Sequence, residues 1–197
     1  MLDVGRKVLW KLINSHGSHE THGFISIRVI REIRVQNKTR MKTILMAGGR
    51  GTRIAELFPN IPKPLIPVAG MPILEREIRS LCAQGFKDII LTVGYLADKI
   101  IAYFGDGSQF GAKIDYFVEE TPLGNAGALF RLREKIGDEP FLLLNADAAF
   151  DVDFNRMVAF HKNHGGLVTL FTHPNSHPYD SGLIIADENG HVEKWLA

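Results

Sequence analysis

Apolar runs and helical repeats alternate along most of the chain. The runs at residues 43–47, 88–93 and 141–144 are nearly continuous, which indicates strands that are buried on both faces of a parallel sheet. Weaker strand patterns follow at 114–118, 167–171, 183–186 and 191–195.

Helical spacing fills the intervals between these strands. Apolar residues recur at helical spacing from Ile73 to Cys82, after Pro72 at a plausible first helical position and before Gly85. Three more helices are predicted from Leu96 to near Gly105, over 123–135 and around 154–161.

This alternation, with short connections, is typical of an α/β fold. We therefore predict a doubly wound, Rossmann-like mixed sheet with helices on both faces. Such sheets bind ligands beyond the carboxyl ends of their strands, near a switch in strand order. Functional residues are expected directly after strands, and the strongest candidates follow Ala47 and Leu144.

The first forty residues differ in kind from the rest. Residues 1–40 carry eight Lys and Arg against three Asp and Glu, whereas residues 41–197 carry fifteen against nineteen. We predict that 1–40 is a poorly structured basic leader or an upstream extension, although His16, His19 and His22 leave a metal site open. Residues 41–197 are predicted to be one domain whose C-terminal part is missing, because the chain stops just after a strand pattern.

The bulk composition argues against several classes of protein. The chain has 197 residues, 45% apolar and 23% charged, with a net charge of +1, which does not suggest a nucleic-acid binder. It has no apolar run of the roughly 18–20 residues that a membrane span requires. Its one cysteine, Cys82, lies in a helical apolar pattern and is expected in the core. A cytoplasmic protein is the expectation.

A glycine-rich loop follows the first strand of this domain. Three of the four residues 48–51 are glycines, so the backbone can turn tightly and bring its N–H groups close to an anion. Arg50 and Arg53 add positive charge that suits phosphate oxygens. The loop has neither the Gly-Lys-Ser/Thr ending of a P-loop nor the spacing of a dinucleotide fingerprint. It therefore indicates a phosphate site of another kind.

Lys63 lies between two prolines, in Pro62-Lys63-Pro64. Proline fixes its own φ and restricts the residue before it, so Lys63 is predicted on a stiff, non-helical stretch. Gly48-Gly49-Arg50-Gly51-Thr52-Arg53, followed by Lys63-Pro64, resembles the signature of the sugar-1-phosphate nucleotidylyltransferases. The resemblance implies that Arg53 neutralises the pyrophosphate leaving group and that Lys63 contacts the phosphates. It also implies triphosphate binding by Ala47, Gly48, Gly49, Gly51 and Thr52.

Two later segments resemble further motifs of that family. Residues 120–127, Glu-Thr-Pro-Leu-Gly-Asn-Ala-Gly, resemble its E-x-P-L-G-T-A-G segment, which implies that Gly124 and Asn125 receive the nucleotide. Residues 143–147 resemble its L-x-G-D strand end, which implies that Asp147 binds Mg²⁺ and is catalytic. Asp153, which follows soon after, is interpreted as a helix cap.

The last segment and the overall run of the chain suggest the acceptor. Gly182, Glu193 and Lys194 resemble the family's sugar-phosphate region. Residues 171–181, with two His-Pro pairs, look most like the bacterial D-glycero-α-D-manno-heptose 1-phosphate guanylyltransferases, and the pairs are interpreted as a rigid loop rather than as metal ligands. The resemblance implies a transfer of GMP from GTP to that sugar phosphate, with release of pyrophosphate. The sugar-phosphate oxygen is already an anion, so no general base is required.

Two alternatives stay open from the sequence. The acceptor could instead be mannose 1-phosphate. A non-catalytic domain that senses sugar nucleotides is also compatible with Ala146, which stands where the family has glycine. Neither a nucleic acid nor a membrane is expected as a partner, and the oligomeric state is left open.

Overall fold

The structure is a computed structural model that describes residues 8–13, 41–49, 51, 54, 56–149, 151–172 and 182–196. For residues 8–13 only the backbone is described. The predicted site residues Thr52 and Arg53, the two His-Pro pairs and most of the basic leader therefore lie outside the described part.

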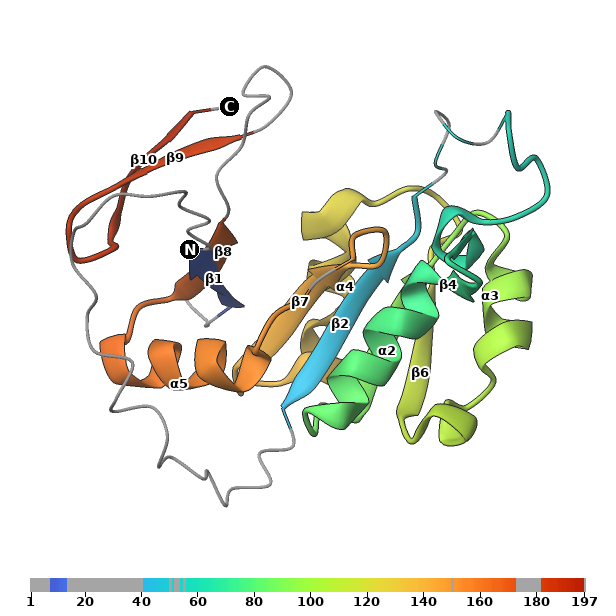
Figure 1. Cartoon of the computed structure of the whole chain (residues 1–197), viewed down its shortest axis with the longest axis horizontal. Coiled ribbons are helices and arrows are strands. Elements are labelled where there is room, and N and C mark those ends of the chain that lie inside the picture. The colour runs from blue at the N-terminus through green and yellow to red at the C-terminus, as the bar shows by residue number, and fades with distance from the viewer. Residues whose placement is uncertain are drawn as a thin grey trace.

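Six strands form one central sheet (Figure 1). Every pairing between its described strands is parallel, so the predicted doubly wound α/β sheet is confirmed but is parallel rather than mixed. The strands lie side by side in the order β6 (Lys113–Val118), β5 (Asp88–Val93), β2 (Lys42–Ala47), β7 (Phe141–Asn145), β1 (Val8–Ile13) and β8 (Val168–Thr172).

Successive side chains along a strand point to opposite faces of the sheet, so the apolar residues form one hydrophobic core on each face. Leu45, Leu91 and Leu142 lie on the face covered by α2 (Ile73–Ala83), α3 (Ala97–Phe104) and α5 (Phe154–His164). Ile44 and Ile90 lie on the other face, against α4 (Gly124–Ile136). Both faces of the sheet are thus buried, which explains why its central strands are nearly continuous apolar runs.

The strand order reverses beside β2. The chain adds β5 and then β6 on one side of β2, and it returns with β7 on the other side. Residues 43–46 of β2 pair with residues 142–145 of β7, so the two strands end at the same level. The carboxyl ends of β2, β5 and β7 therefore meet at a topological switch point, where a doubly wound sheet binds its ligands.

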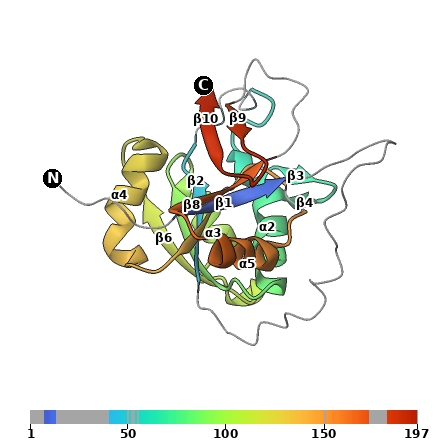
Figure 2. The same cartoon turned by 90° about the vertical axis from the view of Figure 1, so that its left-hand side faces the viewer.

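Strand β1 is a difference from the sequence prediction, which treated residues 1–40 as a poorly structured leader. Residues 8–13 lie in the sheet, paired with β7 and β8. Figure 2 shows β1 beside β8. The pattern Val-Leu-Trp-Lys-Leu-Ile is short and interrupted by a lysine, so it gave no clear strand signal. The division of the chain at residue 41 stays a prediction.

Smaller elements surround the sheet. A two-stranded antiparallel ribbon, β9 (Leu183–Ala186) and β10 (Val192–Leu196), lies apart from it at the upper left of Figure 1. Between β2 and α2, the chain forms the 3-10 turn η2 (Lys63–Leu65) and the short hairpin β3 (Pro67–Val68) with β4 (Met71–Pro72). A second 3-10 turn, η3 (Ser108–Phe110), precedes β6. No helix in the described part of the chain is long and apolar enough to span a membrane.

Two local predictions are confirmed. Asp153 caps α5, since its carboxylate accepts a hydrogen bond from the backbone N–H of Arg156 at 2.9 Å. Cys82 packs against the core, and burial raises the pKa of its thiol, as expected for a packing residue rather than a nucleophile.

Gln84, at the end of α2, fastens the segment that follows β7. Its amide nitrogen donates to the carbonyl of Val152 at 2.9 Å, and its amide oxygen accepts from the N–H of Phe154 at 2.7 Å. The N–H of Phe154 lies in the first turn of α5, and such N–H groups have no hydrogen-bond partner within their own helix. The side chain therefore fastens Val152 and the start of α5 to the end of α2.

We predict that Gln84→Ala destabilises the protein by about 1–3 kcal/mol, because it removes both hydrogen bonds and leaves a partly buried N–H without a partner. Thermal unfolding should show a Tm several degrees lower. Gln109→Ala is the control, since the Gln109 side chain makes one exposed hydrogen bond, to the carbonyl of Tyr103. Equal losses of Tm in the two variants would contradict the role of Gln84.

Candidate active site

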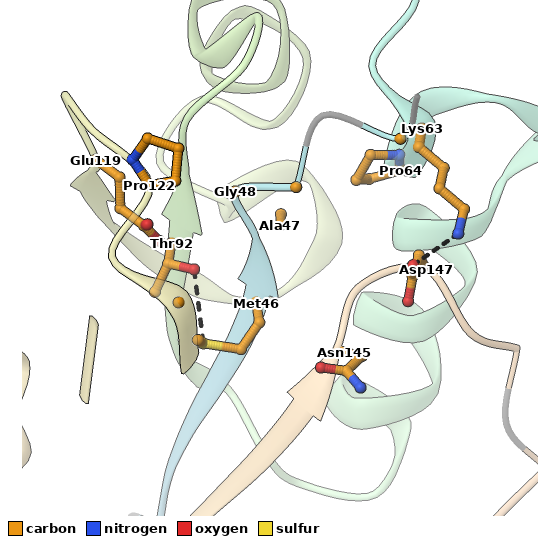
Figure 3. A pocket seen from close by; sticks show the side chains of 13 residues that line it. Met46, Ala47, Gly48, Lys63, Pro64, Thr92, Glu119, Pro122, Asn145 and Asp147 are labelled. Atoms are coloured by element: carbon orange, nitrogen blue, oxygen red, sulfur yellow. Dashed lines mark hydrogen bonds and ion pairs between the residues drawn. The ribbon is translucent and has the colours of Figure 1, made fainter. Parts of the chain in front are cut away.

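A pocket of about 380 Å³ opens at the switch point, over the carboxyl ends of β2, β5 and β7 (Figure 3). Lys63 and Asp147 lie on one side of it, Glu119 and Pro122 on the other, and the start of the glycine loop lies between them. Seven of its lining residues were predicted from the sequence: Ala47, Gly48, Gly49, Gly51, Lys63, Gly124 and Asp147.

Close packing explains why the loop after β2 is built from glycines. A Cβ on Gly48 would lie 2.9 Å from Oε1 of Glu119. Gly51 has a φ of +58°, in the left-handed region, and a Cβ there would lie 3.0 Å from Cβ of Lys63. The glycines thus let the main chain pass between Glu119 and Lys63, with its backbone facing the pocket.

Lys63 is held by its local backbone. It is the first residue of η2, and the turn is closed by the N–H of Leu65 donating to the carbonyl of Pro62 at 2.8 Å. The sequence predicted a stiff, non-helical stretch here, whereas the structure has a single 3-10 turn. Proline at the turn's second position suits this geometry, since its fixed φ is compatible with helical turns.

The ammonium group of Lys63 lies 2.7 Å from Oδ2 of Asp147. The two side chains are 37% and 45% exposed, so the ion pair is screened by solvent and stabilises the protein by about 0–1 kcal/mol at most. Such a pair can exchange its partners for ligands at small cost. The ion pair brings together Lys63, which was predicted to contact the phosphates, and Asp147, which was predicted to bind Mg²⁺.

Asp147 is placed by β7 and by a backbone bond to β2. The N–H of Ala146 donates to the carbonyl of Met46 at 3.1 Å, which extends the β2–β7 pairing by one residue. Ala146 itself is fully buried in the core beneath the pocket and is not part of its lining. Its methyl group therefore takes no space from a ligand, which removes the argument that this residue gave for a non-catalytic domain.

Glu119 is a site residue that the sequence analysis missed. It lies directly after β6, and its Oε2 accepts a hydrogen bond from the N–H of Leu123 at 3.1 Å. The rule that site residues follow strands could have found it, but the motif comparison began one residue later, at Glu120. The sequence analysis also did not single out Met46, Pro64, Thr92, Pro122 and Asn145, which line the same pocket.

The predicted sugar-phosphate residues are not part of this pocket. Gly182 precedes β9, and Glu193 and Lys194 lie on β10, where both are exposed. A Cβ on Gly182 would lie 3.1 Å from Nε1 of Trp195, so this glycine is needed for packing within the ribbon. The side chain of Asn125, in the first turn of α4, lies outside the described part, and its role stays a prediction.

Glu77 is a buried acidic side chain that does not line the pocket. It lies on α2 and is 5% exposed. Burial raises its pKa to about 9, and the negative charge of Asp147 adds to the rise. The side chain is therefore expected to be neutral at pH 7 in the free protein. No group of three or more His, Cys, Asp or Glu side chains in the described part gathers to hold a metal ion unaided.

The raised pKa of Glu77 makes stability depend on pH in a defined direction. Between pH 4.5 and about 9, the unfolded chain releases this proton and the folded protein keeps it, so stability falls as pH rises. Glu77→Gln should remove the effect, on the order of 2–3 kcal/mol between pH 5 and pH 7. Thermal unfolding at several pH values should show Glu77→Gln gaining Tm over the wild type as pH rises, whereas exposed Glu134→Gln should show no such trend. A Tm difference that is constant with pH would contradict the assignment.

Comparisons with known proteins agree with the fold. The family model described as Nucleotidyl transferase matches residues 42–196. A UTP–glucose-1-phosphate uridylyltransferase from Synechocystis is 33% identical over 77% of this chain and 42% of its own length. The mannose-1-phosphate guanylyltransferase catalytic subunit beta of Dictyostelium discoideum is 35% identical over 79% of this chain and 44% of its own length. The chain thus spans less than half the length of these curated relatives.

Among solved structures, HddC from Yersinia pseudotuberculosis complexed with GMP-PN is similar to this chain. The two are 26% identical with a TM-score of 0.62, over 80% of this chain and 69% of that one. This level of similarity supports the same fold over the described domain.

Proposed function

The chain belongs to the nucleotidyl transferase family, and from this membership we propose that it transfers a nucleoside monophosphate from a nucleoside triphosphate to a sugar 1-phosphate, releasing pyrophosphate. The observation that carries the proposal is the pocket at the switch point. It brings together a glycine backbone, a lysine ammonium group and a carboxylate from three segments that are distant in the sequence.

The polyphosphate is proposed to lie along the glycine loop. Backbone N–H groups of Gly48, Gly49 and Gly51 would face it, and the ammonium group of Lys63 would exchange Asp147 for a phosphate oxygen. Arg53, outside the described residues, is proposed to neutralise the pyrophosphate as it leaves. These groups lower the repulsion between the two anions, which is the main barrier to nucleotidyl transfer.

The chemical step is proposed to be a direct in-line displacement. An oxygen of the sugar phosphate attacks the α-phosphorus, and the bond to the pyrophosphate oxygen breaks on the opposite side. The attacking oxygen is already ionised, so the described pocket needs no proton acceptor at this point. Its role is to orient two reactants and balance their charge.

A divalent cation fits the residues present. Asp147 already holds a positive group, the ammonium of Lys63 at 2.7 Å, and carboxylate oxygens are the ligands that Mg²⁺ prefers. Mg²⁺ is commonly held by one or two carboxylates together with substrate phosphates, and so needs no complete protein cage. We propose that Asp147 holds Mg²⁺ with the nucleotide, where the cation would reduce the negative charge of the phosphates.

Glu119 supports guanine as the base. The Watson–Crick edge of guanine offers two adjacent N–H donors, which one carboxylate can accept. Uracil and thymine offer one donor between two carbonyl oxygens, which a carboxylate would repel. Glu119 keeps its Oε1 beside Gly48, and it lies across the pocket from Lys63 and Asp147. We therefore propose GTP as the nucleotide, with the base near Glu119.

A heptose 1-phosphate is proposed as the acceptor, on the resemblance noted in the sequence. Mannose 1-phosphate is the second candidate, favoured by the guanylyltransferase relatives. The test is pyrophosphate release from GTP with D-glycero-D-manno-heptose, mannose or glucose 1-phosphate. The largest kcat/KM identifies the acceptor, whereas nucleotide binding without pyrophosphate release from any pair would favour a sensing domain.

We predict that Lys63→Ala and Arg53→Ala each lower kcat by about 10²–10³, because each removes a positive charge from the reacting phosphates. Steady-state pyrophosphate release measures the effect. Lys99→Ala is the control, because the Lys99 ammonium group bonds the carbonyl of Asn60 and is not among the residues that line the pocket. Wild-type turnover in either pocket variant would exclude the proposed roles.

We predict that Glu119→Gln lowers the preference for GTP over UTP by about 10- to 100-fold, since one charged hydrogen-bond acceptor becomes a donor. The measurement is the ratio of kcat/KM for the two nucleotides at a fixed sugar phosphate. Glu120→Gln, at the adjacent residue outside the pocket lining, is the matched control. An unchanged ratio in Glu119→Gln would show that another residue selects the base.

A further inference from the structure

Two side chains in the described lining of the pocket are polar and uncharged, those of Thr92 and Asn145. Thr92 on β5 and Asn145 on β7 both pair with Met46 of β2 in the register of the sheet. Residues that pair in this way point to the same face of a sheet, and Met46 packs on the face covered by α4. The three side chains therefore form one row along the pocket, with the thioether between a hydroxyl and an amide.

Of these two polar groups, the amide of Asn145 is the one that a ligand can reach. Thr92 is 0% exposed, and its hydroxyl donates a hydrogen bond to Sδ of Met46 at 3.6 Å. Asn145 is exposed at the end of β7, whereas the four residues before it are buried. Its side-chain amide takes part in no hydrogen bond within the described part of the chain, and it lines the pocket together with Met46 and Asp147 (Figure 3).

The proposed reaction brings three kinds of chemical group into the pocket: phosphates, a base and the hydroxyl groups of two sugars. Lys63 and the glycine loop are proposed to bind the phosphates, and Glu119 is proposed to bind the base. The amide of Asn145 suits hydroxyl groups, because it presents a donor N–H and an acceptor oxygen side by side and each hydroxyl can both donate and accept. Because the amide is uncharged, it does not repel the phosphates that Lys63 attracts.

We propose that Asn145 binds two neighbouring hydroxyl groups of a substrate sugar, with its N–H donating to one oxygen and its carbonyl accepting from the other hydroxyl. This inference rests on the proposed function, since it assigns a specificity-determining residue to the same pocket. The ribose of the nucleotide and the ring of the acceptor both carry such a pair. A substrate that lacks one hydroxyl leaves half of the amide without a partner, so Asn145 selects against it.

The experiment compares complete and deoxy substrates in the wild-type protein and in Asn145→Ala. Dissociation constants for GTP, 2′-deoxy-GTP and 3′-deoxy-GTP are measured by calorimetry with Mg²⁺ present. The acceptor is D-glycero-D-manno-heptose 1-phosphate or mannose 1-phosphate, whichever reacts faster, and kcat/KM is measured for it and for its 2-deoxy, 3-deoxy and 4-deoxy forms. Asn163→Ala is the matched control, because Asn163 is an exposed asparagine on α5 outside the pocket lining.

We expect the wild-type protein to prefer the complete substrate over two deoxy forms of one series by about 3- to 30-fold. In Asn145→Ala this preference should fall to within about twofold, whereas the preferences in the other series and the Tm stay as in the wild type. Loss in the nucleotide series identifies ribose as the source of the two hydroxyls, and loss in the acceptor series identifies the acceptor ring. Asn163→Ala should keep every preference.

The outcomes that overturn the inference are separable from those that overturn the proposed function. If Asn145→Ala keeps both preferences while the wild-type protein releases pyrophosphate, Asn145 does not read hydroxyl groups and the proposed function stands. An equal loss of affinity for complete and deoxy substrates also overturns the inference, because it assigns Asn145 a general structural role. If the wild-type protein neither binds GTP nor releases pyrophosphate, the proposed function fails and the inference fails with it.

Discussion

The pairing of β2 with β7 is the constraint on which the pocket depends. Parallel neighbours end at the same edge of a sheet, so the loop after β2 and the carboxylate after β7 must meet. The hydrogen bond from the N–H of Ala146 to the carbonyl of Met46 extends the β2–β7 pairing by one residue beyond the end of β7. A shift of one residue in this register would turn Asp147 towards the opposite face and separate it from Lys63.

The two sides of the pocket at this edge of the sheet are proposed to bind different parts of the nucleotide. Lys63 and Asp147 carry full charges on one side of the pocket, where a polyphosphate is proposed. Glu119 lies on the opposite side, fixed through the N–H of Leu123, where a base is proposed. The described loop residues between them, Gly48, Gly49 and Gly51, have no side chains to fill the space, which suits the proposal that one extended ligand reaches both sides. Gly94, which the sequence analysis did not single out, also allows this close approach, since a Cβ there would lie 3.0 Å from the carbonyl of Gly48.

The sequence predicted those features that local patterns determine. Buried strands and amphipathic helices each leave a signal of their own, and the glycine loop, Lys63 and Asp147 follow motifs. Strand β1 was missed because its six residues have no such periodicity, and its place is set by pairing with strands far along the chain. The ion pair between residues 63 and 147 also depends on the fold. Glu77 was overlooked because a glutamate on a helix is ordinarily exposed, although its spacing from Leu74 and Leu81 placed it on the buried stripe.

Charge balance links the parts of the proposed site. In the free protein, Lys63 and Asp147 neutralise each other, and Glu77 keeps its proton because its pKa is raised to about 9. A triphosphate that takes Lys63 leaves Asp147 without a cation, and a divalent ion that takes Asp147 leaves Lys63 without an anion. Either ligand alone therefore exchanges one ion pair for another and leaves one charge unpaired, whereas both together leave none. It follows from the proposed function that nucleotide and cation should bind cooperatively, and that the half-exposed ion pair of the free protein is weak enough to permit the exchange.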